Sequence, residues 1–202
     1  MSTFVKQYLE YGFGIALLRL SSLLLLPLYT RYLTTGEYGI LDTIAITVAL
    51  VQPIFLLGFD TAVQIAFFKQ DSKDEQDSLV TVVLVSVFLI GIVCALLGAI
   101  WANAISERLF DTAEYTLILR IMFLNVLGMS ILKLGRDNLR LRKRPWGYNA
   151  LTILQVVLQA AFNIYFIAFQ ELGVLGYALG MTSANIIVAI IGVSVLLRNQ
   201  DR

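Results

Sequence analysis

Long apolar segments separated by short polar connections form the main pattern along this chain. Each segment is long enough to cross a hydrocarbon core of about 30 Å at roughly 1.5 Å per helical residue. We expect helices over residues 11–32, 40–68, 79–101, 115–134, 146–169 and 174–197. The pattern therefore predicts an all-α, polytopic membrane protein, with one bundle of six transmembrane helices over residues 1–202.

The second and third segments need separate comment. The second, 40–68, is longer than one span requires, and we expect it to tilt or to bend at Pro53. The third, 79–101, is rich in valine and isoleucine, which favour strands. Its length, without alternation of polar and apolar positions, favours a spanning helix.

Composition supports a membrane location and excludes several kinds of chemistry. Apolar residues make up 58% of the 202 residues and charged residues 14%, against about a quarter in soluble domains. Histidine is absent and Cys94 is the only cysteine, which removes histidine acid–base catalysis and an internal disulfide. No connection is long enough for a catalytic domain. We expect no enzyme, no cofactor and no metal site.

Basic residues gather in the connection between the fourth and fifth segments. They are Lys133, Arg136, Arg140, Arg142, Lys143 and Arg144. The positive-inside tendency places this connection in the cytoplasm, and both chain termini on the same side. Lys6, Lys69, Lys73, Arg198 and Arg202 then also lie inside, against Arg31 and Arg108 outside, a bias of 11 to 2. The run suits topology and anionic lipid head groups, and we expect no nucleic-acid partner.

Arg19 is an ionisable residue within the first segment. At helical spacing it shares a face with Tyr8, Tyr11, Gly12 and Ser22, on the order of 12 Å below the membrane edge. One interpretation is structural, with an arginine that reaches toward the cytoplasm or bridges two helices. The other is a contact to an anionic substrate, because guanidinium binds phosphate oxygens through two hydrogen bonds.

Two further charged residues lie within segments. Asp60 shares a face of the second segment with Pro53 and Gln64, and its depth matches that of Arg19. It is either a structural partner of Arg19 or a group that binds a proton or cation during transport. Arg120 lies near the outer edge, where its side chain is expected to reach toward water, and it ranks below Arg19 as a substrate contact.

The fifth segment carries a stripe of polar side chains. Asn149, Thr152, Gln155, Gln159 and Asn163 fall on one helical face. Lipid cannot satisfy these groups. They serve either interhelical hydrogen bonds or the wall of a polar cavity, where neutral donors and acceptors suit sugar hydroxyls.

Small residues recur at four-residue spacing in the sixth segment. Gly176, Gly180 and Ala184 allow close approach of a neighbouring helix. We interpret them as a packing seam and assign them no ligand.

Several short motifs in order resemble a known family. Pro27-Leu28-Tyr29-Thr30-Arg31-Tyr32-Leu33 is followed by Glu37-Tyr38-Gly39, then Gly58-Phe59-Asp60-Thr61-Ala62 and the basic link from Arg140 to Pro145. Together they resemble the O-antigen and exopolysaccharide flippases of the multidrug, oligosaccharidyl-lipid and polysaccharide exporter superfamily. The resemblance implies translocation of undecaprenyl-pyrophosphate-linked oligosaccharide across a bacterial or archaeal cytoplasmic membrane, by alternating access between two six-helix lobes. Arg19 would match a cavity-facing basic position and Asp60 an acidic position late in helix two.

The chain departs from that family in matching only the first lobe. A cavity-facing Arg19 and an amide stripe would then require a C-terminal lobe, a second chain or a homodimer partner, in addition to membrane lipids. A drug or cation antiporter of the same superfamily is an alternative, in which Asp60 matters more than Arg19. A non-transporting membrane partner or truncated remnant is another.

Overall fold

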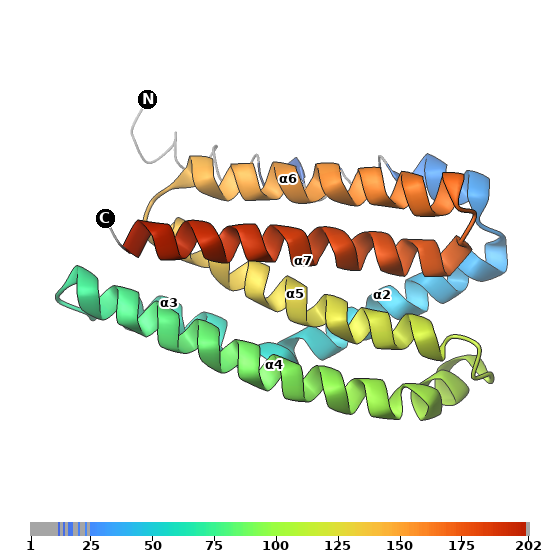
Figure 1. The fold of residues 1–202 in the computed structure, drawn as a ribbon, viewed down its shortest axis with the longest axis horizontal. Coiled ribbons are helices and arrows are strands. Elements are labelled where there is room, and N and C mark those ends of the chain that lie inside the picture. Colours follow the sequence, from blue (N-terminus) through green and yellow to red (C-terminus); the bar gives the residue numbers. More distant parts are fainter. Residues whose placement is uncertain are drawn as a thin grey trace.

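The structure is a computed structural model that describes residues 25–200 and six positions between residues 12 and 23. These residues form a bundle of long helices lying side by side (Figure 1), and no strand occurs among them. Five of the described helices are long and apolar enough to cross a membrane. The first expected helix, 11–32, falls partly outside the described residues, and 25–32 are helical. The predicted all-α, multi-pass membrane fold is confirmed, and the six-helix count and the orientation stay predictions.

The observed helices follow the apolar segments but have different ends. They are α2 (Thr35–Leu56), α3 (Phe59–Phe67), α4 (Lys73–Phe110), α5 (Thr116–Leu141), α6 (Pro145–Asn163), a π-helix η1 (Ile164–Phe169) and α7 (Gly173–Gln200). The expected segment 146–169 is thus α6 continued by η1. The expected segments 115–134 and 174–197 lie within α5 and α7, apart from the first residue of the former.

The expected single helix over 40–68 is two helices, and the expected tilt of the segment or bend at Pro53 stays a prediction. Pro53 lies inside α2, and the chain leaves the helix four residues later. The backbone N–H of Leu57 donates to the carbonyl oxygen of Pro53 at 2.9 Å and closes the last turn. Leu57 and Gly58 then both have positive φ, 44° and 77°. Glycine adopts this conformation without a steric cost, so the Leu57–Gly58 junction ends α2 and lets α3 start in a new direction.

Helix α4 extends well beyond the predicted 79–101. A capping box starts it, in which the Ser72 hydroxyl accepts from the Glu75 N–H and the Glu75 side chain accepts from the Ser72 N–H. Its 38 residues measure about 57 Å at 1.5 Å per residue, against a hydrocarbon core of about 30 Å. The apolar run therefore marks only the middle of the helix, and polar turns extend it at both ends.

Helix α5 lies at the centre of the bundle. It packs most extensively against α7 and α4, and it also contacts α2, α3 and α6. In the most apolar stretch of α5, 61% of the residues are buried, whereas in that of α4 only 22% are buried. Much of α4 is thus exposed in the described bundle, whereas α5 contacts helices on several sides.

The small residues of α7 lie against α6 and η1. A Cβ added to Gly176 would lie 2.9 Å from the carbonyl oxygen of Phe166, and one added to Gly180 would lie 2.9 Å from Asn163 Oδ1. Ala184 is fully buried. Close approach at these positions brings the backbone of α7 against the end of α6, where the helix changes to η1.

Candidate functional site

Asp60 lies in the first turn of α3, next to the Leu57–Gly58 junction, and forms an ion pair with Lys133 of α5. Arg19, its partner in the sequence-based interpretation, lies outside the described residues, so its predicted substrate contact stays a prediction. The cationic partner of Asp60 is thus Lys133, which the sequence analysis interpreted only as a determinant of membrane orientation. Residues 73 positions apart are joined by this contact.

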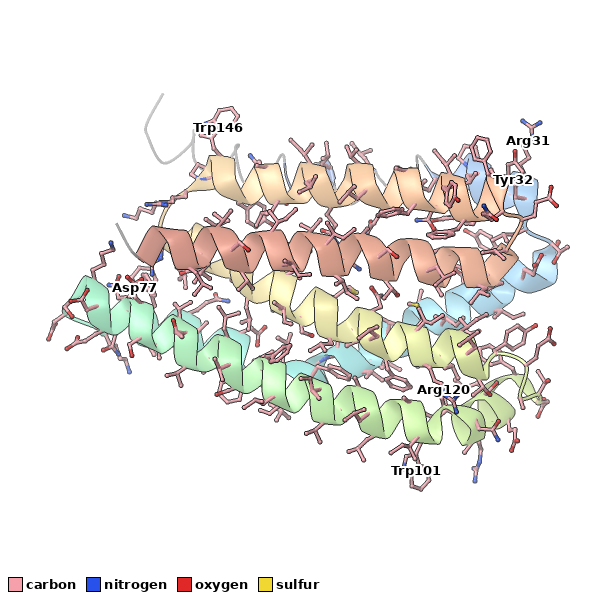
Figure 2. All side chains as sticks on the ribbon, in the orientation of Figure 1. Arg31, Tyr32, Asp77, Trp101, Arg120 and Trp146 are labelled. Atoms are coloured by element: carbon pink, nitrogen blue, oxygen red, sulfur yellow. The ribbon has the colours of Figure 1, made fainter. Side chains whose placement is uncertain are left out.

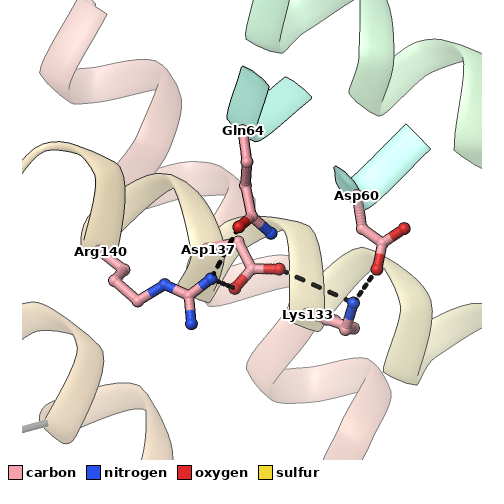
Figure 3. A network of polar contacts seen from close by, with 5 residues as sticks. All are labelled: Asp60, Gln64, Lys133, Asp137 and Arg140. Carbon is pink, nitrogen blue, oxygen red and sulfur yellow. Dashed lines mark hydrogen bonds and ion pairs between the residues drawn. The ribbon is translucent and has the colours of Figure 1, made fainter. Parts of the chain in front are cut away.

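Asp60, Gln64, Lys133, Asp137 and Arg140 form one polar network, which we call the α3–α5 bridge (Figure 3). Lys133 Nζ also lies 3.8 Å from Asp137 Oδ2, one turn along α5. Arg140 Nη2 lies 3.3 Å from Asp137 Oδ1 and donates to Gln64 Oε1 at 3.1 Å. Each cation therefore contacts both the carboxylate of Asp137 and a side chain of α3.

The members of the α3–α5 bridge differ in exposure. The side chains of Lys133 and Arg140 are 37% and 46% exposed, whereas those of Asp60 and Asp137 are 19% and 11% exposed. The network holds two cations and two carboxylates, so its formal charge is zero. The cations form its accessible side, and the carboxylates lie beneath them.

The apolar face of α3 packs beside this network. Val63 and Phe67 are buried in a cluster with side chains of α4 and α5, among them Val80 and Leu134. The polar and apolar contacts together attach α3, which is only nine residues long, to α5 and α4. Side-chain contacts therefore position α3, because no unbroken helix connects it to α2.

A second ion pair joins the end of α5 to the start of α4. Arg142 pairs with Asp77, and both side chains are largely buried, at 13% and 12% exposed. Arg142 Nε also donates to Asn138 Oδ1 at 3.0 Å, and its guanidinium lies 5.6 Å from the centre of the Phe67 ring. Members of the basic link thus have structural roles inside the bundle, besides any role in topology.

Among the residues that the structure describes, the amide stripe of α6 faces α7 and α5. Gln155 and Gln159 are buried, and both donate to Asn185 Oδ1, at 2.7 and 3.1 Å. Asn185 in turn donates to Asn125 Oδ1 at 2.7 Å, and Arg136 donates to Gln155 Oε1 at 2.8 Å. This chain of hydrogen bonds joins α5, α6 and α7. These bonds have the interhelical role that was one of the two expected of the stripe, and a substrate contact by Gln155, Gln159 or Asn163 stays a prediction.

The remaining stripe members are also buried. Asn163 donates to the carbonyl oxygen of Gln159 at 2.7 Å, and Thr152 donates to that of Tyr148 at 2.9 Å. Asn149 is buried at the start of α6. The sequence singled out these side chains correctly as an inward-facing stripe, but it missed Asn125 and Asn185, which complete the network from the neighbouring helices.

Arg120 is separate from both networks. Its Nε donates to the carbonyl oxygen of Ala99 on α4 at 3.2 Å, and its side chain is exposed. Figure 2 shows Arg120 near Trp101, toward the end of α4 opposite Asp77. The structure therefore does not bring Arg120 together with Asp60, Gln64 or the amides of α6.

An apolar groove of about 490 Å³ lies between α4, α5 and α7. Its lining includes Phe88, Leu124, Ile131, Ile186 and Val193. None of the candidate polar residues lines it. Among the residues that the structure describes, no three His, Cys, Asp or Glu side chains are grouped so as to hold a metal ion.

The comparisons with known proteins identify the family. The family of polysaccharide biosynthesis proteins matches residues 6–200, which is nearly the whole chain. No curated protein and no solved structure matches the chain significantly. With its membrane-spanning helices, the chain thus belongs to the family of polysaccharide biosynthesis proteins.

Proposed function

We propose that this chain is one lobe of a flippase that moves a lipid-linked oligosaccharide, carried on undecaprenyl pyrophosphate, across the cytoplasmic membrane. The match to polysaccharide biosynthesis proteins over residues 6–200 carries the proposal. A glycan assembled on a lipid carrier inside the cell must cross the membrane before it is used outside, and that step requires a multi-pass membrane protein. The chain acts in transport and not as an enzyme.

Two features of the described residues support a transporter over a passive membrane partner. The α3–α5 bridge ties one charged side chain, Asp60, and the amide of Gln64 on a short helix to cations of α5, and the Leu57–Gly58 junction separates that helix from α2. The amide network makes α5, α6 and α7 one connected unit. Alternating access requires such a combination of a firm unit and an element that can change position.

The orientation follows from the distribution of basic residues. The end of the bundle that holds the α3–α5 bridge and Arg142 faces the cytoplasm, and both chain termini lie on that side. Arg19 contacts the anionic part of the substrate from the first helix. A second lobe, from the same protein, a second chain or a second copy, completes the cavity.

Translocation of the lipid-linked glycan in proteoliposomes tests the proposal. The chain is reconstituted together with the lobe that completes its cavity, and the fraction of labelled lipid-linked oligosaccharide reached by an added glycosidase is measured over time. We expect transfer with the wild type and a strong loss with Arg19→Ala, but no loss with Arg108→Ala, which removes a charge in the outer part of α4. No transfer of glycan together with transfer of a labelled cationic drug would refute the flippase and favour the antiporter. Asp60, on which an antiporter would depend, is paired with Lys133 in this structure.

A further inference from the structure

The two cations of the α3–α5 bridge are shared between helices. Lys133 contacts Asp137 on its own helix and Asp60 on α3, and Arg140 contacts Asp137 and Gln64 in the same way (Figure 3). Asp137 therefore keeps both cations close to one carboxylate. The contacts to α3 are the ones that another anion can replace without leaving either cation unpaired.

The chemistry of the accessible side favours phosphate. Lys133 and Arg140 are the exposed members of the bridge, so an anion that approaches from water meets ammonium and guanidinium groups before carboxylates. A phosphate carries more charge than a carboxylate and offers more acceptor oxygens. Guanidinium and ammonium groups are the side chains that proteins use to bind it.

Replacement of Asp60 and Gln64 by a phosphate changes how α3 is attached to the bundle. Two successive residues with positive φ, Leu57 and Gly58, separate α3 from α2, so no continuous helix fixes its direction. Asp60 and Gln64 are its polar ties to α5, and both use the cations in question. If a phosphate takes those cations, α3 keeps the apolar contacts around Val63 and Phe67 and the contact of the Arg142 guanidinium with the Phe67 ring, but loses these two ties to α5.

We propose that Lys133 and Arg140 form a phosphate-binding site, and that phosphate displaces Asp60 and Gln64 and thereby releases α3 from α5. The site serves as the first contact for the phosphate group of the lipid-linked substrate, a part of the inference that rests on the proposed function. A free phosphate ion has the same chemistry and is the other source. In both cases binding at the cations and attachment of α3 oppose each other.

Because the two events compete, weakening the attachment must strengthen binding by the same factor. Asp60→Asn removes the anion that competes for Lys133 and leaves both cations in place. We expect this variant to bind phosphate more tightly, by about fivefold or more. The double variant Lys133→Ala and Arg140→Ala should lose about tenfold or more in affinity. Arg144→Ala, which removes an exposed charge at the same end of the bundle, should change affinity less than twofold.

The experiment uses the full chain in lipid nanodiscs, with two probes. One is inorganic phosphate, and the other is phosphatidic acid, compared with nanodiscs of phosphatidylcholine alone. Binding is measured by calorimetry for the ion and by retained labelled lipid for phosphatidic acid. Hydrogen exchange of the amides of residues 59–67 reports the attachment of α3. We expect exchange there to become faster on binding, whereas an ordinary ligand slows it.

The outcomes distinguish a free phosphate ion from a lipid phosphate, and they test the phosphate site separately from the proposed transport function. Binding of inorganic phosphate that depends on Lys133 and Arg140 supports the site with a free ion as a sufficient ligand. Binding of phosphatidic acid alone supports the site with a lipid source. Absence of both, equal binding by the double variant, or slower exchange of α3 on binding overturns the inference. None of these measurements requires transport, so a chain that binds phosphate but moves no glycan refutes only the proposed function.

Discussion

Asn185 is the residue on which the connection between α5, α6 and α7 depends. Its side chain accepts from Gln155 and Gln159 and donates to Asn125, and the three partners are buried. Hydrogen bonds between transmembrane helices contribute about 0.6 kcal/mol each on average, so Asn185→Ala should lower the free energy of unfolding by about 2 kcal/mol. Asn103→Ala makes the same chemical change at an exposed position and should cost less than about 0.5 kcal/mol.

Reversible unfolding in mixed micelles of mild detergent and dodecyl sulfate measures both variants against the wild type. The double variant Asn125→Ala/Asn185→Ala completes a cycle for their shared hydrogen bond. We expect a coupling free energy between about 0.6 and 1.7 kcal/mol. Equal losses for Asn185→Ala and Asn103→Ala, or no coupling in the cycle, would refute a network in which Asn185 is the central member.

Three further substitutions test local features of the fold by the same unfolding assay. Gly180→Ala should destabilise the fold by about 1 to 3 kcal/mol, because its Cβ would lie 2.9 Å from the side-chain oxygen of Asn163. Gly135→Ala is the control, because a Cβ there meets open space, and this variant should not destabilise the fold. Gly58→Ala should lower the free energy of unfolding by about 1 kcal/mol, because φ at this position is 77°. Gly39→Ala, where a Cβ meets open space and φ is not positive, should not lower it. Equal effects of the two variants would argue against a strained backbone at the Leu57–Gly58 junction. Arg142→Ala should cost about 3 kcal/mol because it removes the cation that pairs with a largely buried carboxylate of α4. A neutral result would show that the pair is dispensable.

Much of the fold follows from the sequence because hydropathy and helical period are local properties. The apolar segments identify the spans, and the period of 3.6 residues identifies the buried stripe on α6. The start of α4 could also have been found, since Ser72 and Glu75 stand at the spacing of a capping box. The break after α2 is harder to predict, because Pro53 is the stronger local signal and Leu57 has no sequence feature that indicates positive φ.

The candidate site could be predicted only in part, because ion pairs depend on which helices become neighbours. Asp60 and Gln64 stand out as polar residues in an apolar segment, and both take part in the α3–α5 bridge. Lys133 and Arg140 were interpreted only as determinants of membrane orientation, because their partners Asp60 and Gln64 lie 73 and 76 positions away along the chain. Asn185 was missed for the same reason, since a single amide in a long apolar helix has no local partner to reveal its role.

The central position of α5 affects how the protein is made. The ribosome completes Asn125 of α5 well before Asn185 of α7, because 60 residues separate them. At about 5–20 residues per second, this delay lasts roughly 3 to 12 s. Throughout that time the central helix carries an amide whose final partner has not been synthesised. A helix that is synthesised later than α5 therefore supplies this interior hydrogen bond, and the interior around Asn125 is complete only once α7 has packed against α5.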